Sequence, residues 1–341
     1  MKILITVDPE IPVPPKLYGG IERLVDGLAQ QYQSMGHTVI LLAHPESDCK
    51  YASRIYGWIA LQSRGWRNVF KNSHRLLQVY RIERPDVIHS FSRLLYLYPT
   101  LISTKVSFLM TYQRDISVRS TNLARWLGRG RIRFTAAAGH MLSHLPNKKL
   151  FTAVYNFTPT QYFVPDATAQ REHLMFLGRI EDIKGTREAI EVALASGQKL
   201  IIAGNIQPGH DAYFDTYIEP HLQNPLIQYV GPVNDEQKRY WLQRATALLF
   251  PIKWEEPFGI VMAEAMACGT PVLAFRRGSV PEVVIDGING FVCKNTQEMI
   301  DAVKRLPLLN TEAIRADCIS RFSAEAIGSK YLYLLSNMAK V

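Results

Sequence analysis

Residues 256–272 read Glu-Pro-Phe-Gly-Ile-Val-Met-Ala-Glu-Ala-Met-Ala-Cys-Gly-Thr-Pro-Val, the most informative stretch of this 341-residue chain. Its centre predicts a helix that ends at Gly269, a residue suited to a left-handed cap. Glu256 precedes that helix and Glu264 lies two turns inside it. Two carboxylates in one region can bind sugar hydroxyls through charge-assisted hydrogen bonds, while free N–H groups at the helix start can meet hydroxyls or phosphates. Taken singly, Glu256 could be a favourable anion at the helix start and Glu264 a surface charge.

The stretch lies within a repeating pattern of strands and helices. Short apolar, β-rich runs occur at 2–7, 38–43, 86–89, 106–110, 174–177, 200–203, 227–230, 247–250 and 271–274. Helical spacing of apolar residues lies between them at 21–32, 187–195, 235–245 and 259–267, and again at 324–338. Such alternation predicts an α/β protein with parallel sheets covered by helices, here twice over.

We therefore expect two facing Rossmann-like domains with a ligand cleft between them, at the carboxyl ends of both sets of strands. The pattern is interrupted by prolines near 155–170. This places the first domain at 1–155, the second at 156–321 and a closing amphipathic helix within 322–341.

Composition excludes several protein classes. Hydrophobic residues make up 47% and charged residues 20% of the chain, which excludes disorder and fibrous folds. No uncharged apolar run reaches the roughly 18 residues of a membrane span, and the apolar start is too short for a signal-peptide core. The four cysteines show no metal-ligand spacing. These features favour a cytoplasmic protein.

The positive charge is concentrated in the first half of the chain. Residues 1–160 hold 21 Lys and Arg against 9 Asp and Glu, whereas 161–341 hold 18 against 21. Basic residues mix with aromatic ones at 50–81 and 114–133, which suits an anionic membrane surface. A soluble anionic acceptor or an incidental basic face remains an alternative. No recognition motif for nucleic acid appears, so no nucleic-acid partner is expected.

A second motif follows the strand at 174–177. It runs Gly178-Arg179-Ile180-Glu181-Asp182-Ile183-Lys184-Gly185. Arg179 and Lys184 could hold a diphosphate between a planar guanidinium and a point-charge ammonium. Two exposed surface cations are the alternative.

Together these motifs resemble the retaining glycosyltransferases of family four, which have the GT-B fold of two facing Rossmann-like domains. The resemblance covers nearly the whole chain and is strongest over 174–292. It implies that 1–155 is the acceptor-side domain, that 156–321 binds the nucleotide sugar, and that the helix at 322–341 crosses back to the first domain. Many members of the family act on lipid-linked acceptors, so the resemblance also favours such an acceptor. It implies that Glu256 lies beside the donor sugar and Glu264 binds the nucleotide ribose. It also implies that Arg179 and Lys184 bind the diphosphate.

The resemblance extends to positions with weaker patterns of their own. The backbone at Phe258, Gly259 and Ile260 would touch the sugar and phosphate. Gly19 and Gly20, in the segment Tyr18-Gly19-Gly20-Ile21-Glu22, would approach the donor phosphates at a helix start, although a plain loop is an alternative. The remaining expected donor-binding residues end two strands: Gly204, Val230 and Gly231.

The acceptor side departs from the family pattern. Family members place a histidine after an N-terminal strand, where this chain has Met110-Thr111-Tyr112-Gln113-Arg114-Asp115. Tyr112 or Gln113 could take that position, but neither carries a proton as imidazole does. His89 follows another strand and is either an acceptor-side residue or a satisfied core histidine.

The resemblance implies transfer of a sugar from a nucleoside diphosphate to a hydroxyl acceptor with retention of configuration. A uridine diphosphate donor is favoured over a guanosine one. The absence of Asp-x-Asp is consistent with metal independence, and no cofactor is expected. Alternatives are a protein that binds a sugar nucleotide without transfer, and a GT-B isomerase or phosphorylase.

Overall fold

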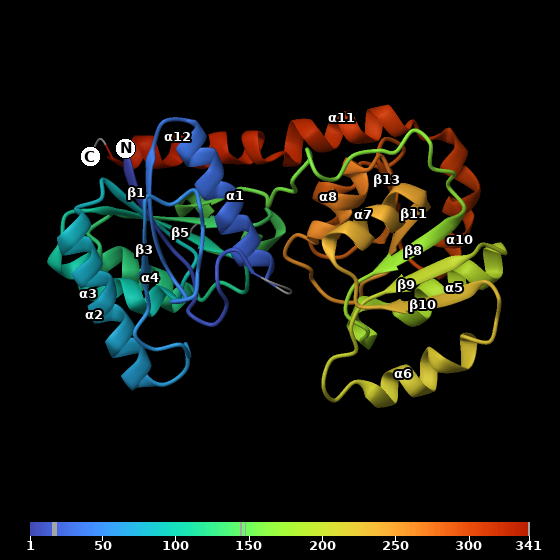
Figure 1. Ribbon diagram of the computed structural model, residues 1–341, viewed down its shortest axis with the longest axis horizontal. Helices are drawn as coiled ribbons and strands as arrows, with labels where there is room; N and C mark the ends of the chain where they lie inside the picture. Colours follow the sequence, from blue (N-terminus) through green and yellow to red (C-terminus); the bar gives the residue numbers. More distant parts are fainter. Residues whose placement is uncertain (16–18, 144, 147, 340–341) are drawn as a thin grey trace. The chain divides into compact units, whose positions relative to one another are not determined.

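The computed structural model describes residues 1–15, 19–143, 145–146 and 148–339 (Figure 1). The chain forms two compact units. Unit 1 comprises Met1–Asn156 and the segment from Ala324 onward, and unit 2 comprises Phe157–Ser323. The sequence places its boundaries at 155/156 and 321/322, next to these divisions.

Unit 1 is built on a seven-stranded parallel sheet in the order β3-β2-β1-β4-β5-β6-β7. Its strands are β1 (Lys2–Thr6), β2 (Thr38–Ala43), β3 (Arg54–Gly57), β4 (Val87–Ser90), β5 (Ser107–Tyr112), β6 (Ile132–Ala136) and β7 (Phe151–Ala153). Ile3, Leu4 and Ile5 of β1 are fully buried. Because helices cover both faces of a parallel sheet, its central strands are apolar throughout rather than alternating.

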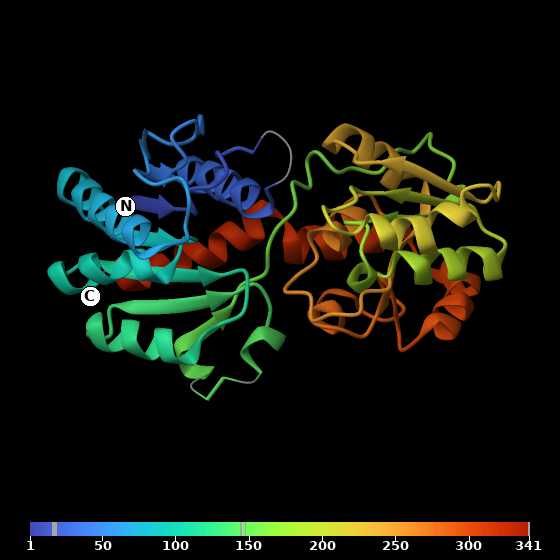
Figure 2. The same cartoon turned by 90° about the horizontal axis from the view of Figure 1, so that it is seen from below.

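The helices of unit 1 form two layers. They are α1 (Gly20–Ser34), α2 (Trp66–Glu83), α3 (Leu94–Ser103), α4 (Val118–Leu127) and α12 (Ala324–Ala339). α12 packs against α1, β4 and β5, while α3 packs between α2 and α4 on the other face, which Figure 2 brings to the front. The predicted return of the C-terminal helix to the first domain is confirmed.

His89 lies inside this core, at the end of β4. Its Nδ1 is 2.9 Å from the Tyr32 hydroxyl and its Nε2 is 2.8 Å from Oγ1 of Thr111. The imidazole is fully buried, with its centroid 4.8 Å from the Tyr331 ring. Burial lowers the pKa of His89 to about 3, so the ring is neutral. The sequence left two interpretations of His89 open, an acceptor-side residue or a core histidine with its hydrogen bonds satisfied. The structure shows the core histidine, and we remove His89 from the acceptor-side candidates.

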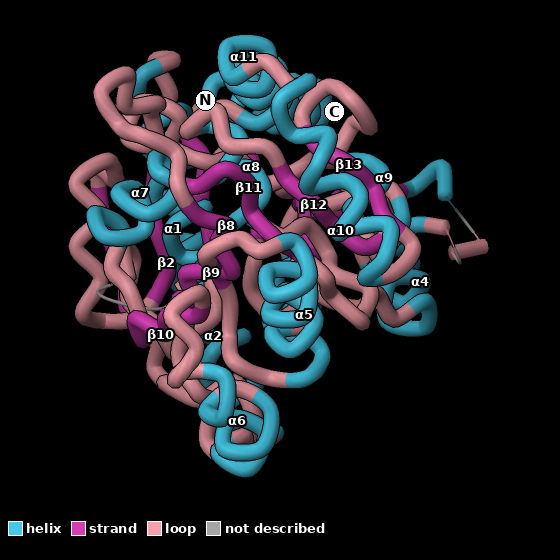
Figure 3. The backbone as a smooth tube through the Cα atoms, turned by 90° about the vertical axis from the view of Figure 1, so that its right-hand side faces the viewer, coloured by secondary structure: helices cyan, strands magenta, loops and turns pink. Residues whose placement is uncertain are grey.

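Unit 2 repeats the architecture with a six-stranded parallel sheet in the order β10-β9-β8-β11-β12-β13 (Figure 3). The strands are β8 (His173–Leu177), β9 (Leu200–Ala203), β10 (Ile227–Gly231), β11 (Ala245–Phe250), β12 (Val272–Phe275) and β13 (Gly290–Cys293). The helices are α5 (Thr186–Ser196), α6 (Asp211–Tyr217), α7 (Asp235–Arg244), α8 (Ile260–Ala267), α9 (Val280–Val283), α10 (Thr296–Arg305) and α11 (Thr311–Phe322).

Each sheet has one point at which the strand order reverses. It falls between β1 and β4 in unit 1 and between β8 and β11 in unit 2. Ligands of open parallel sheets bind at the carboxyl ends of the strands that flank this switch point, because the loops there diverge. In unit 2 those loops are Gly178–Gly185 and Pro251–Gly259, which contain both charged motifs.

The predicted strands and helices are confirmed, with ends shifted by a few residues. Four strands were not predicted: β3, β6, β7 and β13. They lie in the outer parts of the two sheets, where an arginine interrupts β3 and β6 and where β7 and β13 are only three and four residues long. No helix in the described part of the chain combines the length and hydropathy that crossing a bilayer requires.

Acid should destabilise the fold through His89. The unfolded imidazole titrates near pH 6.5 and the folded one near 3, so the unfolded state binds the proton first as pH falls. The contribution of His89 is therefore complete above pH 6.5, and about 2 kcal/mol of unfolding free energy is lost between pH 7 and 5.

Urea unfolding of the His89→Gln variant at both pH values checks this, since glutamine keeps an amide but does not titrate. We expect the variant to lose about 2 kcal/mol less than the wild type over that range. Burial lowers the pKa of His173 to about 4, and that residue contributes equally to both proteins. Equal pH dependence in the two proteins would contradict the account.

Gly185 should tolerate no side chain. Its φ is +80°, and a Cβ there would lie 2.0 Å from the Pro251 carbonyl oxygen. Gly197 has a φ of +65° with nothing within 4 Å of such a Cβ, so it is a matched control. We expect Gly197→Ala to cost about 1–2 kcal/mol from left-handed strain alone, and Gly185→Ala about 1–3 kcal/mol more. Urea titration measures both, and equal costs would contradict the predicted contact.

Candidate functional site

The two switch-point loops of unit 2 are held side by side. The Lys253 N–H donates to the Ile183 carbonyl over 2.9 Å. The Lys253 ammonium forms ion pairs with Asp182 at 2.7 Å and Glu188 at 2.6 Å. The close approach of Gly185 to Pro251 adds a backbone contact. The geometry of one loop therefore determines the geometry of the other.

Lys184 and Glu256 meet where these loops come together. Their Nζ and Oε2 atoms are 2.6 Å apart, and each side chain is only 14% exposed. The Trp254 indole N–H donates to the same Oε2 over 3.0 Å. The Lys184 ammonium lies 4.8 Å from the Trp254 ring centroid, a cation–π distance. Carboxylate, ammonium and indole thus form one compact group. The sequence singled out Lys184 and Glu256 as site residues, but it predicted neither their contact nor Trp254.

The Glu256 backbone is also fixed from the loop after β12. Ser279 donates its N–H to the Glu256 carbonyl over 3.0 Å and its hydroxyl to the Phe258 carbonyl over 2.8 Å. A Cβ on Gly278 would lie 2.4 Å from both N and O of Glu256. Only glycine lets the two backbones approach this closely.

Glu264 lies on α8 with one oxygen paired and one free. Its Oε1 is 2.5 Å from the Lys238 ammonium, which α7 supplies. Its Oε2 is buried and has no hydrogen-bond partner among the described residues. Burial lowers the pKa of Lys238, but the carboxylates of Glu264 and Asp235 outweigh that effect and raise it above its usual value. The free Oε2 can accept a hydrogen bond from a hydroxyl group of a ligand.

Lys238 was not predicted as a site residue. It lies in a helix that the sequence did predict, but no motif marks it. Its place beside Glu264 depends on how α7 packs against α8. Periodicity alone therefore could not have identified it.

Arg179 is held by its neighbour in the same motif. Its guanidinium is 2.7 Å from Glu181, a 7% exposed side chain, and Arg179 itself is 35% exposed. His210 lies 3.8 Å from the other Glu181 oxygen. Glu181 therefore orients Arg179 near the start of the loop, while Lys184 lies at its far end.

The predicted glycines at the ends of β8, β9 and β10 lie together. A Cβ on Gly204 would lie 1.7 Å from the Gly178 carbonyl oxygen. The Gly204 N–H donates to Gly231 over 2.9 Å, and the Tyr229 hydroxyl donates to the Gly204 carbonyl over 2.8 Å. Val230 is half-buried beside them. These residues form a close-packed backbone surface at the carboxyl edge.

Phe258, Gly259 and Ile260 shape the start of α8. Phe258 is 1% exposed, and Gly259 caps the helix with a φ of +71°. A Cβ on Gly259 would lie 2.9 Å from both Phe250 and Met262. Ile260 is the first helical residue, so the unpaired N–H groups of α8 begin directly after the Glu256 loop.

In unit 1, the described part of the glycine-pair segment begins at Gly19; Tyr18 lies outside the described residues. Gly20 starts α1. A Cβ on Gly19 would lie 2.6 Å from Pro15 and 2.9 Å from the Glu22 carboxylate. Close packing thus requires glycine at position 19, and the approach of this segment to the donor phosphates stays a prediction.

The two other acceptor-side candidates are engaged within unit 1. Gln113 and Asn156 form a reciprocal amide pair, with both hydrogen bonds 2.8 Å long. Tyr112 is 8% exposed, and burial raises the pKa of its hydroxyl well above its usual range. Among the described residues, no three His, Cys, Asp or Glu side chains form a group that could hold a metal ion.

Comparison with known proteins extends these observations. Residues 160–321 match the family model "Glycosyl transferases group 1", and residues 18–144 match "Glycosyltransferase Family 4". A D-inositol 3-phosphate glycosyltransferase from Arthrobacter sp. (strain FB24) is 30% identical over 149 residues, which is 40% of this chain and 35% of that protein. The matches to four proteins of that name cover 24–35% of their own lengths.

Solved structures show the same fold over the chain. A glycosyltransferase from Rickettsia africae ESF-5 has a TM-score of 0.81 at 18% identity, covering 99% of this chain and 98% of that one. Anabaena Alr3699/HepE in complex with UDP has a TM-score of 0.78 at 17% identity, covering 99% and 100%. These neighbours have the two-domain α/β architecture called GT-B. With two adjacent family models matched on this fold, the chain belongs to the family 4, group 1 type glycosyltransferases.

Proposed function

We propose that the protein is a retaining, metal-independent glycosyltransferase that moves a hexose from a nucleoside diphosphate sugar to a hydroxyl acceptor. A uridine diphosphate donor is favoured over a guanosine one, because HepE, a neighbour of the same fold, has been solved in complex with UDP. The observation that carries the proposal is the group of partly buried charges at the switch point of unit 2: Lys184, Glu256 and Glu264.

This arrangement is difficult to explain by stability alone. Removing an ion pair from water costs free energy that the attraction often fails to recover, so a buried pair is weak evidence for a structural role. Here the pair lies where parallel sheets bind ligands, and the buried Oε2 of Glu264 finds no hydrogen-bond partner in the part of the chain that the structure describes. Charged groups gathered at such a site indicate function.

Each group has a proposed role in transfer. Lys184 and Arg179 bind the diphosphate, whose negative charge grows as the glycosidic bond breaks, and the first N–H groups of α8 add positive potential. The free oxygen of Glu264 accepts a hydrogen bond from a ribose hydroxyl. When the diphosphate forms an ion pair with the Lys184 ammonium, Glu256 is released from Lys184. Its carboxylate then accepts hydrogen bonds from hydroxyl groups of the donor sugar.

Retention of configuration follows from front-face attack in this scheme, with the departing diphosphate oxygen assisting removal of the acceptor proton. Fixed cations act without reorganising during the reaction, so they stabilise the transition state most. Arg179, Lys184 and the helix start supply the charge that a metal ion supplies in other transferases, and no cofactor is needed.

The acceptor is a hydroxyl compound, lipid-linked or otherwise anionic, because unit 1 carries the excess of positive charge. We place the protein in the cytoplasm, peripheral to the inner face of the membrane. All four cysteines are buried and unpaired, which agrees with a reducing compartment. A protein that binds sugar nucleotides without turnover is the second candidate. It is favoured by the engaged amide of Gln113, one of the two residues that could stand in for the histidine of the family pattern.

Turnover of a donor panel tests the proposal. Purified protein is incubated with uridine and guanosine diphosphate sugars, and release of nucleoside diphosphate is measured. We expect release from a uridine donor, and a loss of about 10²–10³ in rate in Glu256→Gln.

Glu255→Gln is the matched control, since that neighbouring side chain is 65% exposed and should keep most of the activity. Donor binding without release by the wild type, with or without added acceptor lipids, would favour the binding protein instead. Equal rates for Glu256→Gln and Glu255→Gln would remove Glu256 from the mechanism.

Trp254→Phe tests whether the indole orients Glu256. Phenylalanine keeps a ring beside Lys184 but removes the N–H donor to the carboxylate, so we expect kcat to fall about tenfold with little change in KM. Trp241→Phe, whose ring instead packs against His173, should leave both constants near the wild-type values. A change confined to KM would show that Trp254 serves donor binding rather than orientation.

A further inference from the structure

The start of α2 presents large apolar side chains to solvent. Trp66 is 76% and Phe70 71% exposed, and their spacing of four residues puts them on one face of the helix. In the loop before the helix, Ile59 is 52% and Leu61 45% exposed. Single exposed apolar residues are ordinary, but four within residues 59–70 form a patch that indicates a partner.

The loop is anchored, so these side chains cannot simply fold inward. Trp58 is buried and donates its indole N–H to the Val7 carbonyl over 2.7 Å. Fully buried Asn72 bonds both the N–H and the carbonyl of Ala60, each over 2.9 Å. With residues 58 and 60 fixed inward, residues 59 and 61 point outward. The patch is thus a built feature of unit 1.

Its surroundings are strongly basic. Residues 49–82 contain seven Lys and Arg and no Asp or Glu. Arg64, Arg67 and Lys71 are exposed among the apolar side chains, and the Arg67 guanidinium lies 5.4 Å from the Trp66 ring centroid. One carboxylate reaches this loop, that of Glu10, which accepts the Ser63 N–H over 2.7 Å. The cations still outnumber it, and an apolar surface with a rim of cations is complementary to an anionic lipid surface.

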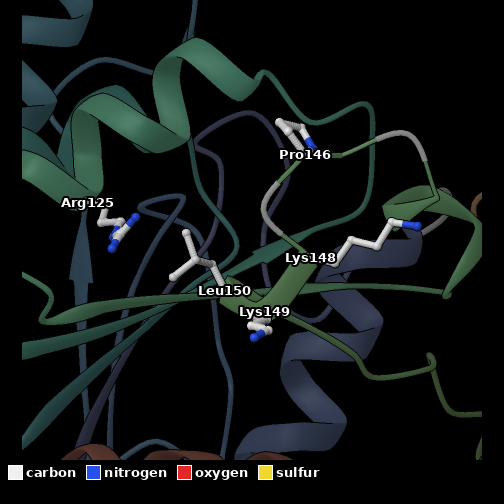
Figure 4. A pocket seen from close by; sticks show the side chains of 5 residues that line it. All are labelled: Arg125, Pro146, Lys148, Lys149 and Leu150. Atoms are coloured by element: carbon white, nitrogen blue, oxygen red, sulfur yellow. The ribbon is translucent and has the colours of Figure 1, made fainter.

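The exposed tryptophan of the second basic and aromatic segment lies at the opposite edge of the sheet. Helices of a parallel α/β unit begin at the carboxyl edge of the sheet and end at its amino edge. Trp126, 75% exposed, is near the end of α4. Next to that helix, Arg125, Lys148 and Lys149 line a hollow of about 500 Å³ with Pro146 and Leu150 (Figure 4). The exposed aromatic residues at the start of α2 and at the end of α4 therefore do not form one surface.

Only the patch at the start of α2 lies at the carboxyl edge of unit 1, where the loops after its strands carry Gly19 and Gln113. We infer that this carboxyl-edge patch (Ile59, Leu61, Trp66 and Phe70 with Arg64, Arg67 and Lys71) docks unit 1 on an anionic lipid bilayer. The aromatic rings enter the interface while the cations contact lipid phosphates. Docking requires neither donor nor turnover, so its test is independent of the proposed transfer.

Vesicle binding of the full chain tests this inference. Phosphatidylcholine vesicles are compared with vesicles that contain about a third phosphatidylglycerol, by co-sedimentation and by the fluorescence of tryptophan. We expect binding to the anionic vesicles alone. Replacing Arg64, Arg67 and Lys71 together by serine should weaken binding to the anionic vesicles about 100-fold, because each lost cation weakens it about fivefold. Trp66→Ala with Phe70→Ala should weaken it at least tenfold.

Leu123→Ala with Trp126→Ala is the matched control, because it removes exposed apolar residues from the other basic segment and should bind as the wild type does. Circular dichroism checks that all variants fold, which their exposed positions favour. The inference is overturned if the wild type ignores anionic vesicles, if the control loses as much binding as Trp66→Ala with Phe70→Ala, or if the patch residues instead support binding of mixed-sequence RNA or self-association in solution.

Discussion

The ion pair between Lys184 and Glu256 is the interaction on which the candidate site depends. It joins a loop that follows β8 to a loop that follows β11, and those two strands flank the switch point of the unit 2 sheet. Trp254 contacts both partners, and the Ser279 backbone and hydroxyl hold the main chain around Glu256. In the proposed mechanism an arriving diphosphate competes with Glu256 for the same ammonium. The pair thus keeps both groups in position before the donor binds.

Close backbone contacts make this arrangement possible. Gly185, Gly204 and Gly278 each lie where a Cβ would be within 2.4 Å of a neighbouring main-chain atom. Each contact ties one carboxyl-edge loop to another. The candidate site is therefore built from loops that close backbone contacts hold in place, which suits a mechanism that depends on fixed charges.

The central strands were predictable from the sequence because both faces of a parallel sheet are buried. Runs such as Leu200–Ala203 have no polar interruption, and they identified the doubly wound pattern. The outer strand β6 alternates between exposed Arg133 and buried neighbours, and β7 has only three residues, so neither produced a signal. Lys184 and Glu256 were found for a different reason: each belongs to a motif whose spacing can be recognised in the sequence. Lys238 and Trp254 join the site through tertiary contacts, which cannot be predicted from residue spacing in the sequence. In the same way, only the packing around His89 distinguished a core histidine from an acceptor-side one.

A structure of the protein crystallised with a uridine diphosphate sugar tests the central claim most directly. The account predicts that the Lys184 ammonium leaves Glu256 for a diphosphate oxygen, that the ribose hydroxyls meet the free oxygen of Glu264, and that Trp254 still donates to Glu256. A donor bound elsewhere, or bound beside an intact pair between Lys184 and Glu256, would contradict it.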